Sequence, residues 1–278
     1  MSGREEDCMN VTIIGCGKMG CAMVRGLLKS GLVSAQDMVI TNRSGTVPDA
    51  LAGIPGLRFL TDNRAACADS DFILLAVLPQ RYEEVLAEIR DAAPEGACLL
   101  SIAPGYSIRR ITELTENRFP VIRAMPNTPA VIGEGMIAVC ENPAVPQKVF
   151  DGALTLFSAL GRTEVIREEQ LNAVIGVSGS APAYFYVFLD ALADAGVLGG
   201  LHREQAVRLA EQTMLGCARL AIATGDHPAA LKDMVCSPAG TTIEAVAKLE
   251  ACGFRNAVIQ AAAAAMEKAQ KMAGAGGK

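Results

Sequence analysis

The sequence predicts an α/β domain with a parallel-rich sheet, followed by an all-helical C-terminal region. Short apolar runs alternate with helical patterns over the first part of the chain, which is typical of a parallel sheet covered by helices on both faces. From about Glu168 onward the strand pattern disappears and long helical patterns follow one another. We therefore expect two domains, residues 1–167 and residues 168–278.

The expected strands are short and apolar, and the helices between them have apolar residues at helical spacing. In chain order the strands are Val11–Ile14, Met38–Thr41, Arg58–Leu60, Phe72–Val77, Cys98–Ile102, Val121–Ala124, Met136–Val139 and Thr163–Ile166. The helices of the first domain are Cys21–Ser30, Tyr82–Arg90 and Gln147–Leu160.

The second domain is expected to consist of helices Ala183–Gly196, Arg203–Thr224, Ala229–Val235, Thr241–Cys252 and Ala257–Met272. Five consecutive alanines at 261–265 suit close helix–helix contacts. Because so apolar a helical region seldom stays exposed on both sides, we expect subunits to associate through it.

The composition describes a globular protein and excludes several partners. Of 278 residues, 51% are hydrophobic and 20% are charged, as in a chain with a large core. The net charge of −5 argues against non-specific nucleic-acid binding, which needs basic surface. We see no secretory signal and no apolar run long enough to cross a bilayer, and we expect a cytoplasmic protein. The nine cysteines form no Cys-x-x-Cys pair, which favours reduced thiols over a metal site.

A glycine motif directly follows the first expected strand. Gly15 permits a tight turn, Gly17 lets a pyrophosphate approach the backbone, and Gly20 lets the helix pack closely on the strand. Lys18 and Met19 occupy the variable positions, where free N–H groups at the start of the helix face an anion. This strand–loop–helix order predicts a dinucleotide site in a Rossmann domain; the alternative is an ordinary strand–turn–helix connection.

The end of the second strand indicates which nicotinamide cofactor is bound. In this fold an Asp or Glu there accepts hydrogen bonds from the ribose hydroxyl of NAD. Here the strand ends in Asn42, Arg43 and Ser44, with no carboxylate before Asp49. A planar cation beside short neutral donors suits a 2′-phosphate, so NADP(H) is expected. The alternative is that Arg43 points into solvent.

Four further segments make the pattern more specific than a generic dinucleotide fold. They are RAMPNTP at 123–129, SGSAPAY at 178–184, DALADAGV at 190–197 and SPAGTT at 237–242. Together with the glycine loop they resemble the pyrroline-5-carboxylate reductase family, over about residues 10 to 272.

The resemblance implies NADPH-dependent reduction of 1-pyrroline-5-carboxylate to L-proline, the last step of proline synthesis. It also implies a helical dimerisation domain, with dimers often assembled into decamers. In the substrate site, Ser237, Gly240, Thr241 and Thr242 would receive the carboxylate, and Thr242 would lie near the imine nitrogen. In the cofactor cleft, Asn63 would contact the adenosine end. The walls would be lined by Ala76, Val77, Leu78 and Pro79, and by the segment Ile102–Gly105, which includes Ala103.

Two of these assignments also follow from the residues themselves, each with an alternative. The segment at 237–242 precedes a helical run, so free N–H groups and hydroxyls suited to a carboxylate stand at a helix start; the alternative is a plain helix cap with a Pro–Gly turn. Asn127 follows a Met-Pro turn and either reaches the nicotinamide amide or stabilises its loop.

The chain departs from the family pattern at several positions. Leu78 stands where the family usually has Lys, which removes a cation near the cofactor phosphates. Ala181 and Ala239 replace commoner glycines, Pro104 replaces an alanine, and Met234 stands where Asn is often found. These changes leave the cofactor preference and the identity of the imine open.

Other functions remain as alternatives. One is a reductase of another cyclic imine acid, and a second is a non-catalytic NADPH-binding regulator. A third is a hydroxyacid dehydrogenase of related architecture. Such enzymes usually have a catalytic Lys on the first helix after the Rossmann domain, and residues 172–192 contain no Lys, which disfavours this function. Asp190 and Asp194 share a helix face, where a surface or interface is favoured over acid–base or metal chemistry. Tyr184 and Tyr186 are expected to pack in the core.

Overall fold

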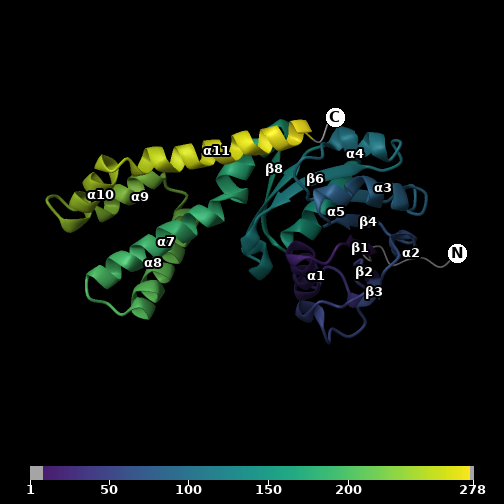
Figure 1. Cartoon of the computed structure of the whole chain (residues 1–278), viewed down its shortest axis with the longest axis horizontal. Helices are drawn as coiled ribbons and strands as arrows, with labels where there is room; N and C mark the ends of the chain where they lie inside the picture. Colours follow the sequence, from purple (N-terminus) through teal and green to yellow (C-terminus); the bar gives the residue numbers. More distant parts are fainter. Residues whose placement is uncertain (1–8, 276–278) are drawn as a thin grey trace. The chain divides into compact units, whose positions relative to one another are not determined.

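The computed structural model describes residues 9–275, which form two compact units dividing after Gly179. Residues 180–264 make up the second unit, and the last part of the C-terminal helix is assigned to the first. Cys8 lies outside the described residues. The expected α/β fold with a parallel-rich sheet and an all-helical C-terminal region is confirmed (Figure 1).

The first unit is built on one eight-stranded sheet with the order β3-β2-β1-β4-β5-β6-β7-β8. Neighbours from β3 to β6 are parallel, β7 is antiparallel to β6, and β8 is parallel to β7. The antiparallel pair follows from its short connection, since a parallel crossover needs a dozen or more residues. The strands are β1 (Val11–Ile14), β2 (Met38–Thr41), β3 (Arg58–Leu60), β4 (Phe72–Leu75), β5 (Cys98–Ser101), β6 (Val121–Pro126), β7 (Gly135–Cys140) and β8 (Gly161–Ile166).

Helices cover both faces of this sheet because alternate strand residues are apolar on both sides. On one face, Ile13 of β1 packs in a cluster with residues of α1 (Lys18–Ser30) and α5 (Gln147–Ser158). On the other, Ile14 packs with residues of α2 (Asn63–Cys67), α3 (Tyr82–Arg90) and α4 (Ile108–Leu114). This arrangement leaves the carboxyl ends of the parallel strands as the open edge of the sheet.

The eight strands lie where they were expected: three have the expected bounds, and the ends of the others differ by one or two residues. Within the expected first domain, two short α-helices were not expected from the sequence, α2 (Asn63–Cys67) and α4 (Ile108–Leu114). Each has too few residues to display a helical apolar repeat. The local signal is instead a side-chain cap: Asp62 accepts from the N–H of Arg64, and Ser107 accepts from the N–H of Arg110, as is typical of helix starts.

The helical region lies close to expectation and contains one irregularity. After α6 (Leu171–Val174), the segment Ile175–Gly179 forms a π-helical turn before α7 begins. Pro182 has no N–H to donate to the carbonyl of Ser178, so a regular α-helix cannot run through this point. The remaining helices are α7 (Ala181–Leu198), α8 (Arg203–Thr224), α9 (Pro228–Val235), α10 (Thr241–Ala251) and α11 (Phe254–Ala275).

The apolar surface of α7 corrects two expectations. The continuous helical stretch Glu168–Leu198 is long and apolar enough to cross a membrane, by length and composition only. The expectation that the chain has no apolar run of that length was therefore wrong. Core packing was also wrong for Tyr186, which is 64% exposed, and Phe185 beside it is 58% exposed. Both follow from one property: α7 is apolar around much of its circumference, and the single chain covers little of it.

Candidate functional site

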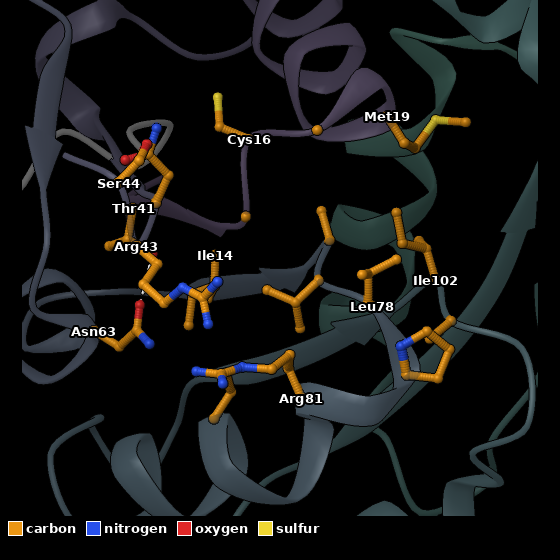
Figure 2. A pocket seen from close by; sticks show the side chains of 18 of the residues that line it. Ile14, Cys16, Met19, Thr41, Arg43, Ser44, Asn63, Leu78, Arg81 and Ile102 are labelled. Atoms are coloured by element: carbon orange, nitrogen blue, oxygen red, sulfur yellow. Dashed lines mark hydrogen bonds between the residues drawn. The ribbon is translucent and has the colours of Figure 1, made fainter. Parts of the chain in front are cut away.

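A pocket of about 1070 Å³ lies at the carboxyl ends of β1, β2, β4 and β5 (Figure 2). The strand order reverses between β1 and β4, and open α/β sheets bind ligands at such a switch point. Most residues expected to bind the cofactor line this pocket: Gly15, Gly17, Lys18, Met19, Asn42, Arg43, Ser44, Asn63, Ala76, Val77, Leu78, Pro79 and Ala103.

The three glycines of the motif after β1 fill different roles. Gly15 has φ +99°, and a Cβ there would lie 2.7 Å from the carbonyl oxygen of Ala76. A Cβ on Gly20 would lie 2.1 Å from the carbonyl oxygen of Gly15, so this glycine brings α1 close to β1. Gly17 caps α1 without a side-chain hydrogen bond, and a Cβ there would meet nothing within 4 Å. The free space at Gly17 fits a phosphate at the helix N-terminus.

A chain of hydrogen bonds fixes the wall at the end of β2. The hydroxyl of Thr41 donates to Asn63 Oδ1 at 2.6 Å. Asn63 Nδ2 in turn donates to Glu88 Oε2 on α3 at 2.6 Å. Thr41 is 1% exposed, so the amide is anchored to the sheet and has a defined orientation at the edge of the pocket.

The loop after β2 presents an arginine to the pocket. Asn42 Nδ2 donates to the carbonyl of Thr46 at 2.5 Å, and Ser44 Oγ accepts from the N–H of Thr46 at 3.3 Å. These bonds close the loop around Arg43, whose exposed side chain extends into the pocket. Figure 2 shows its guanidinium on the same side of the pocket as Asn63.

The opposite wall is supported by Tyr82, a buried residue that does not itself line the pocket and that the sequence did not indicate as part of the site. Its hydroxyl donates to the carbonyl of Leu75 at 3.0 Å and lies 3.1 Å from Ser101 Oγ. Tyr82 is fully buried, and burial raises the pKa of its phenol to about 12. It therefore ties the ends of β4 and β5 together and fixes the start of α3. Leu78, in the loop between β4 and α3, is 72% exposed.

Asn127 does not line the pocket, and its side chain has partners within the chain. Its Oδ1 accepts from the N–H of Met136 at 2.9 Å. Its Nδ2 lies 3.3 Å from Ser178 Oγ and 3.4 Å from the Ser178 carbonyl, the group that Pro182 leaves without a helical donor. Of the two interpretations of Asn127, this geometry favours the stabilisation of its loop.

Cys16 lies beside the phosphate loop with its thiol 3.6 Å from that of Cys21. Burial, reinforced by the hydrogen bond with Cys21, raises the pKa of Cys16 to about 12. The thiolate is the reactive form, so this side chain is a poor nucleophile near neutral pH.

The second expected cradle lies in the helical unit, in the loop that begins at Ser237. The N–H of Gly240 donates to the carbonyl of Ser237 at 3.1 Å, and Ala239 has φ +55°. This is the pattern of a type II turn with Ala at the position that favours Gly. A Cβ on Gly240 would lie 2.3 Å from Ser237 Oγ. Gly240 then caps α10 without a side chain, which leaves the first N–H groups of that helix free of helical partners.

Asp190 and Asp194 both lie on the exposed surface of α7. Asp194 forms an ion pair with Arg203 of α8 at 2.5 Å. This agrees with the interpretation of these carboxylates as helix surface.

Comparisons with known proteins agree along nearly the whole chain. Residues 168–272 match the family model for pyrroline-5-carboxylate reductase dimerisation, and residues 10–105 match the NADP oxidoreductase, coenzyme F420-dependent, model. The Escherichia coli pyrroline-5-carboxylate reductase is 41% identical over 94% of this chain and 97% of its own length. The enzyme of the same name from Arabidopsis thaliana is 35% identical over 94% and 95%.

Solved structures give the same result. A pyrroline-5-carboxylate reductase from Coxiella burnetii superposes with a TM-score of 0.87 and 31% identity, over 95% of this chain and 98% of that one. A pyrroline carboxylate reductase from Plasmodium falciparum, solved with NADP bound, superposes with a TM-score of 0.86 and 28% identity, over 96% and 99%. With the dinucleotide pocket and the helical region described above, these matches show that the chain belongs to the pyrroline-5-carboxylate reductase family.

Proposed function

We propose that this chain reduces 1-pyrroline-5-carboxylate to L-proline with NADPH, the last step of proline biosynthesis. The observation that carries the proposal is the pocket at the β1–β4 switch point, where open space at Gly17 fits a pyrophosphate. Relatives at 41% and 35% identity are pyrroline-5-carboxylate reductases.

The reaction asks little of the side chains. Bound NADPH would supply a hydride for the imine carbon, which would turn the protonated C=N group of the ring into a secondary amine. A protonated imine is already an electrophile, so the protein acts mainly by holding the ring in place. We assign Thr242 to orient the imine nitrogen: its hydroxyl donates to the neutral imine nitrogen, or accepts from the N–H once the imine is protonated. This is a smaller contribution than the positioning itself.

The substrate carboxylate is assigned to the loop at 237–242. The first N–H groups of α10 and the positive end of its dipole suit a carboxylate, and Ser237 and Thr241 add hydroxyls. The type II turn places Gly240 against Ser237 and so fixes where the helix begins.

Preference for NADPH over NADH is assigned to Arg43. Its side chain enters the pocket at the end of β2, where an NAD-binding domain of this fold has a carboxylate. Asn42 and Ser44 shape the loop that presents it.

The helical region is assigned to assembly. The dimerisation model covers 168–272, and α7 leaves large apolar residues exposed. We propose a homodimer as the unit, built into a larger ring such as a decamer, in a cytoplasmic protein without nucleic-acid or membrane partners. The proposed functional boundary stays near residue 167, although the compact units divide after Gly179.

The test of the reaction is an assay of the purified protein with two imine acids, the five-membered pyrroline and its six-membered homologue. We expect NADPH oxidation with the pyrroline acid and formation of L-proline. Thr242→Val should lower kcat about 10-fold or more while cofactor affinity stays unchanged, and Thr242→Ser should recover most of the rate. Tight NADPH binding without oxidation of either imine would instead indicate a regulatory protein, and a preference for the larger ring would indicate another imine reductase.

The test of the cofactor assignment is Arg43→Ala. Loss of the guanidinium should raise KM for NADPH about 10-fold or more and leave KM for NADH nearly unchanged, because only NADPH has the 2′-phosphate. Equal effects on both cofactors would contradict the assignment.

A further inference from the structure

A second arginine, Arg81, lines the cofactor pocket on the wall opposite Arg43 (Figure 2). We propose that Arg81 and Arg43 together bind the 2′-phosphate of NADPH, one from each wall, and that Arg81 is a specificity-determining residue. The proposal rests on the NADPH use proposed above and adds a second cation to it.

Neighbouring residues hold the backbone of Arg81 in place. It ends the 3-10 turn η3 (Pro79–Arg81), and its N–H donates to the carbonyl of Leu78 at 2.9 Å. It also caps α3, directly before the fully buried Tyr82. Arg81 lies three residues after Leu78, and it restores a cation to a loop that has an apolar residue at 78.

The side chains of Arg43 and Arg81 both extend into the pocket, and in Figure 2 both end on the side where Asn63 lies. Two cations in one pocket repel each other, with an energy that depends on their separation and on the local dielectric. An anion between them removes this repulsion and gains two charge-assisted contacts with planar donors. A phosphate monoester near neutral pH carries between one and two negative charges, so it is the natural occupant.

The carboxylates on the same wall are already engaged. Glu84 Oε1 pairs with Arg81 at 2.5 Å, and Glu88 accepts from Asn63 at 2.6 Å. The Arg81 and Glu84 side chains are 39% and 50% exposed, and pairs of this kind contribute little to stability. Glu84 can therefore orient Arg81 while other N–H groups of the guanidinium remain able to bind a phosphate.

The position of Arg81 favours the 2′-phosphate over the pyrophosphate. The pyrophosphate has its own cradle at Gly17 and the start of α1. In Figure 2 the Arg81 side chain runs from the loop that contains Leu78 toward Asn63 and Arg43, and away from Met19. That direction leads to the end of β2, where this fold places the adenosine ribose.

The experiment measures binding by calorimetry, without turnover. The ligands are 2′,5′-ADP and 5′-AMP, which differ only in the 2′-phosphate, together with NADPH and NADH. The variants are Arg81→Gln, Arg81→Lys, Arg43→Gln and the double Gln variant. The matched control is Arg109→Gln, an arginine that is 87% exposed on α4 and does not line the pocket.

We expect Arg81→Gln to weaken 2′,5′-ADP binding about 10-fold and to leave 5′-AMP binding within twofold. NADPH-over-NADH selectivity should fall by the same factor, Arg81→Lys should recover part of the loss, and Arg109→Gln should change nothing. Because both arginines bind one phosphate, the double variant should lose less than the product of the two single losses.

Equal losses for 2′,5′-ADP and 5′-AMP, or no loss for either, would overturn the proposal. Retained 5′-AMP binding shows that a variant is folded. The result is independent of the imine reaction. A selective loss in a protein without turnover would support the arginine pair and contradict the proposed function. Turnover without a selective loss would support the proposed function and contradict the arginine pair.

Discussion

At the scale of single residues, the glycine loop separates requirements of the fold from requirements of the cofactor. Gly20 is needed by the fold, since a methyl group there would lie 2.1 Å from a carbonyl oxygen. Gly17 has φ −75° and open space around it. An alanine at 17 is therefore compatible with the folded chain, and its methyl group would project into the space assigned to the pyrophosphate.

The pair Gly17→Ala and Gly20→Ala tests this separation. Gly17→Ala should leave Tm within a degree or two and weaken NADPH and NADH equally, by about 10-fold or more. Gly20→Ala should lower stability by several kcal/mol, because backbone must move to relieve the overlap. Melting curves and titrations with both cofactors check the two outcomes. Undiminished cofactor binding by Gly17→Ala would place the pyrophosphate elsewhere.

At the scale of elements, the helix starts and turns depend on a few polar contacts that the sequence only partly reveals. The existence of the helices and strands followed from apolar spacing. The hydrogen bonds of Asn127 with the N–H of Met136 and with Ser178 could not be predicted from that spacing, because those residues are 9 and 51 positions away. Its role was left open at the sequence level for that reason.

Asn127→Ala tests whether this side chain supports the fold. It would leave a main-chain N–H and a carbonyl without their partner, and we expect a loss of about 1–3 kcal/mol in the free energy of unfolding. Asn127→Asp keeps the acceptor for Met136 and should lose less. Chemical denaturation measures both. A large rise in the Kd for NADPH with unchanged stability would show that Asn127 acts on the nicotinamide.

The turn before α10 contains a strained alanine. Ala239 has φ +55°, a conformation that costs a residue with a Cβ about 1–2 kcal/mol, whereas glycine adopts it freely. After the greater chain entropy of glycine is subtracted, Ala239→Gly should stabilise the protein by roughly 0.5–1 kcal/mol. Urea denaturation checks this, with Ala245→Gly in the middle of α10 as a control that should destabilise by about 1 kcal/mol.

At the scale of the whole molecule, the sequence indicated the sheet, the helical half and the cofactor end, because these depend on local apolar patterns and short motifs. It did not indicate Tyr82, Arg81 or Glu88 as site residues. Their importance comes from side chains that meet across the sheet edge, from strands and helices distant in sequence. It also placed Tyr186 of α7 in the core, although this side chain is exposed in the single chain.

The core of the first unit also predicts how stability depends on pH. Burial raises the pKa of Cys98 from 9.0 to about 12, and Cys67 and Cys140 are shifted in the same way. The unfolded chain therefore releases these protons first. The contribution of these thiols to the free energy of unfolding is therefore complete below pH 9. It declines between pH 9 and pH 12, by about 1.4 kcal/mol per thiol at pH 10.

Cys98→Ala should be less stable at pH 8, because it leaves a small cavity. Between pH 8 and pH 10, however, it should lose about 1.4 kcal/mol less than the parent chain. Urea denaturation at the two pH values measures the difference, and Cys217→Ala on the exposed face of α8 serves as the control. Identical losses for the parent and Cys98→Ala would contradict the assignment.

The amide of Asn63 is held from both sides, by the hydroxyl of Thr41 and the carboxylate of Glu88. Its torsion angles are therefore set when the chain folds. A nucleotide that binds beside Asn63 meets an amide whose hydrogen-bonding directions already exist, and this side chain has little rotational freedom left to lose. Binding at this end of the pocket should accordingly carry a small entropic penalty.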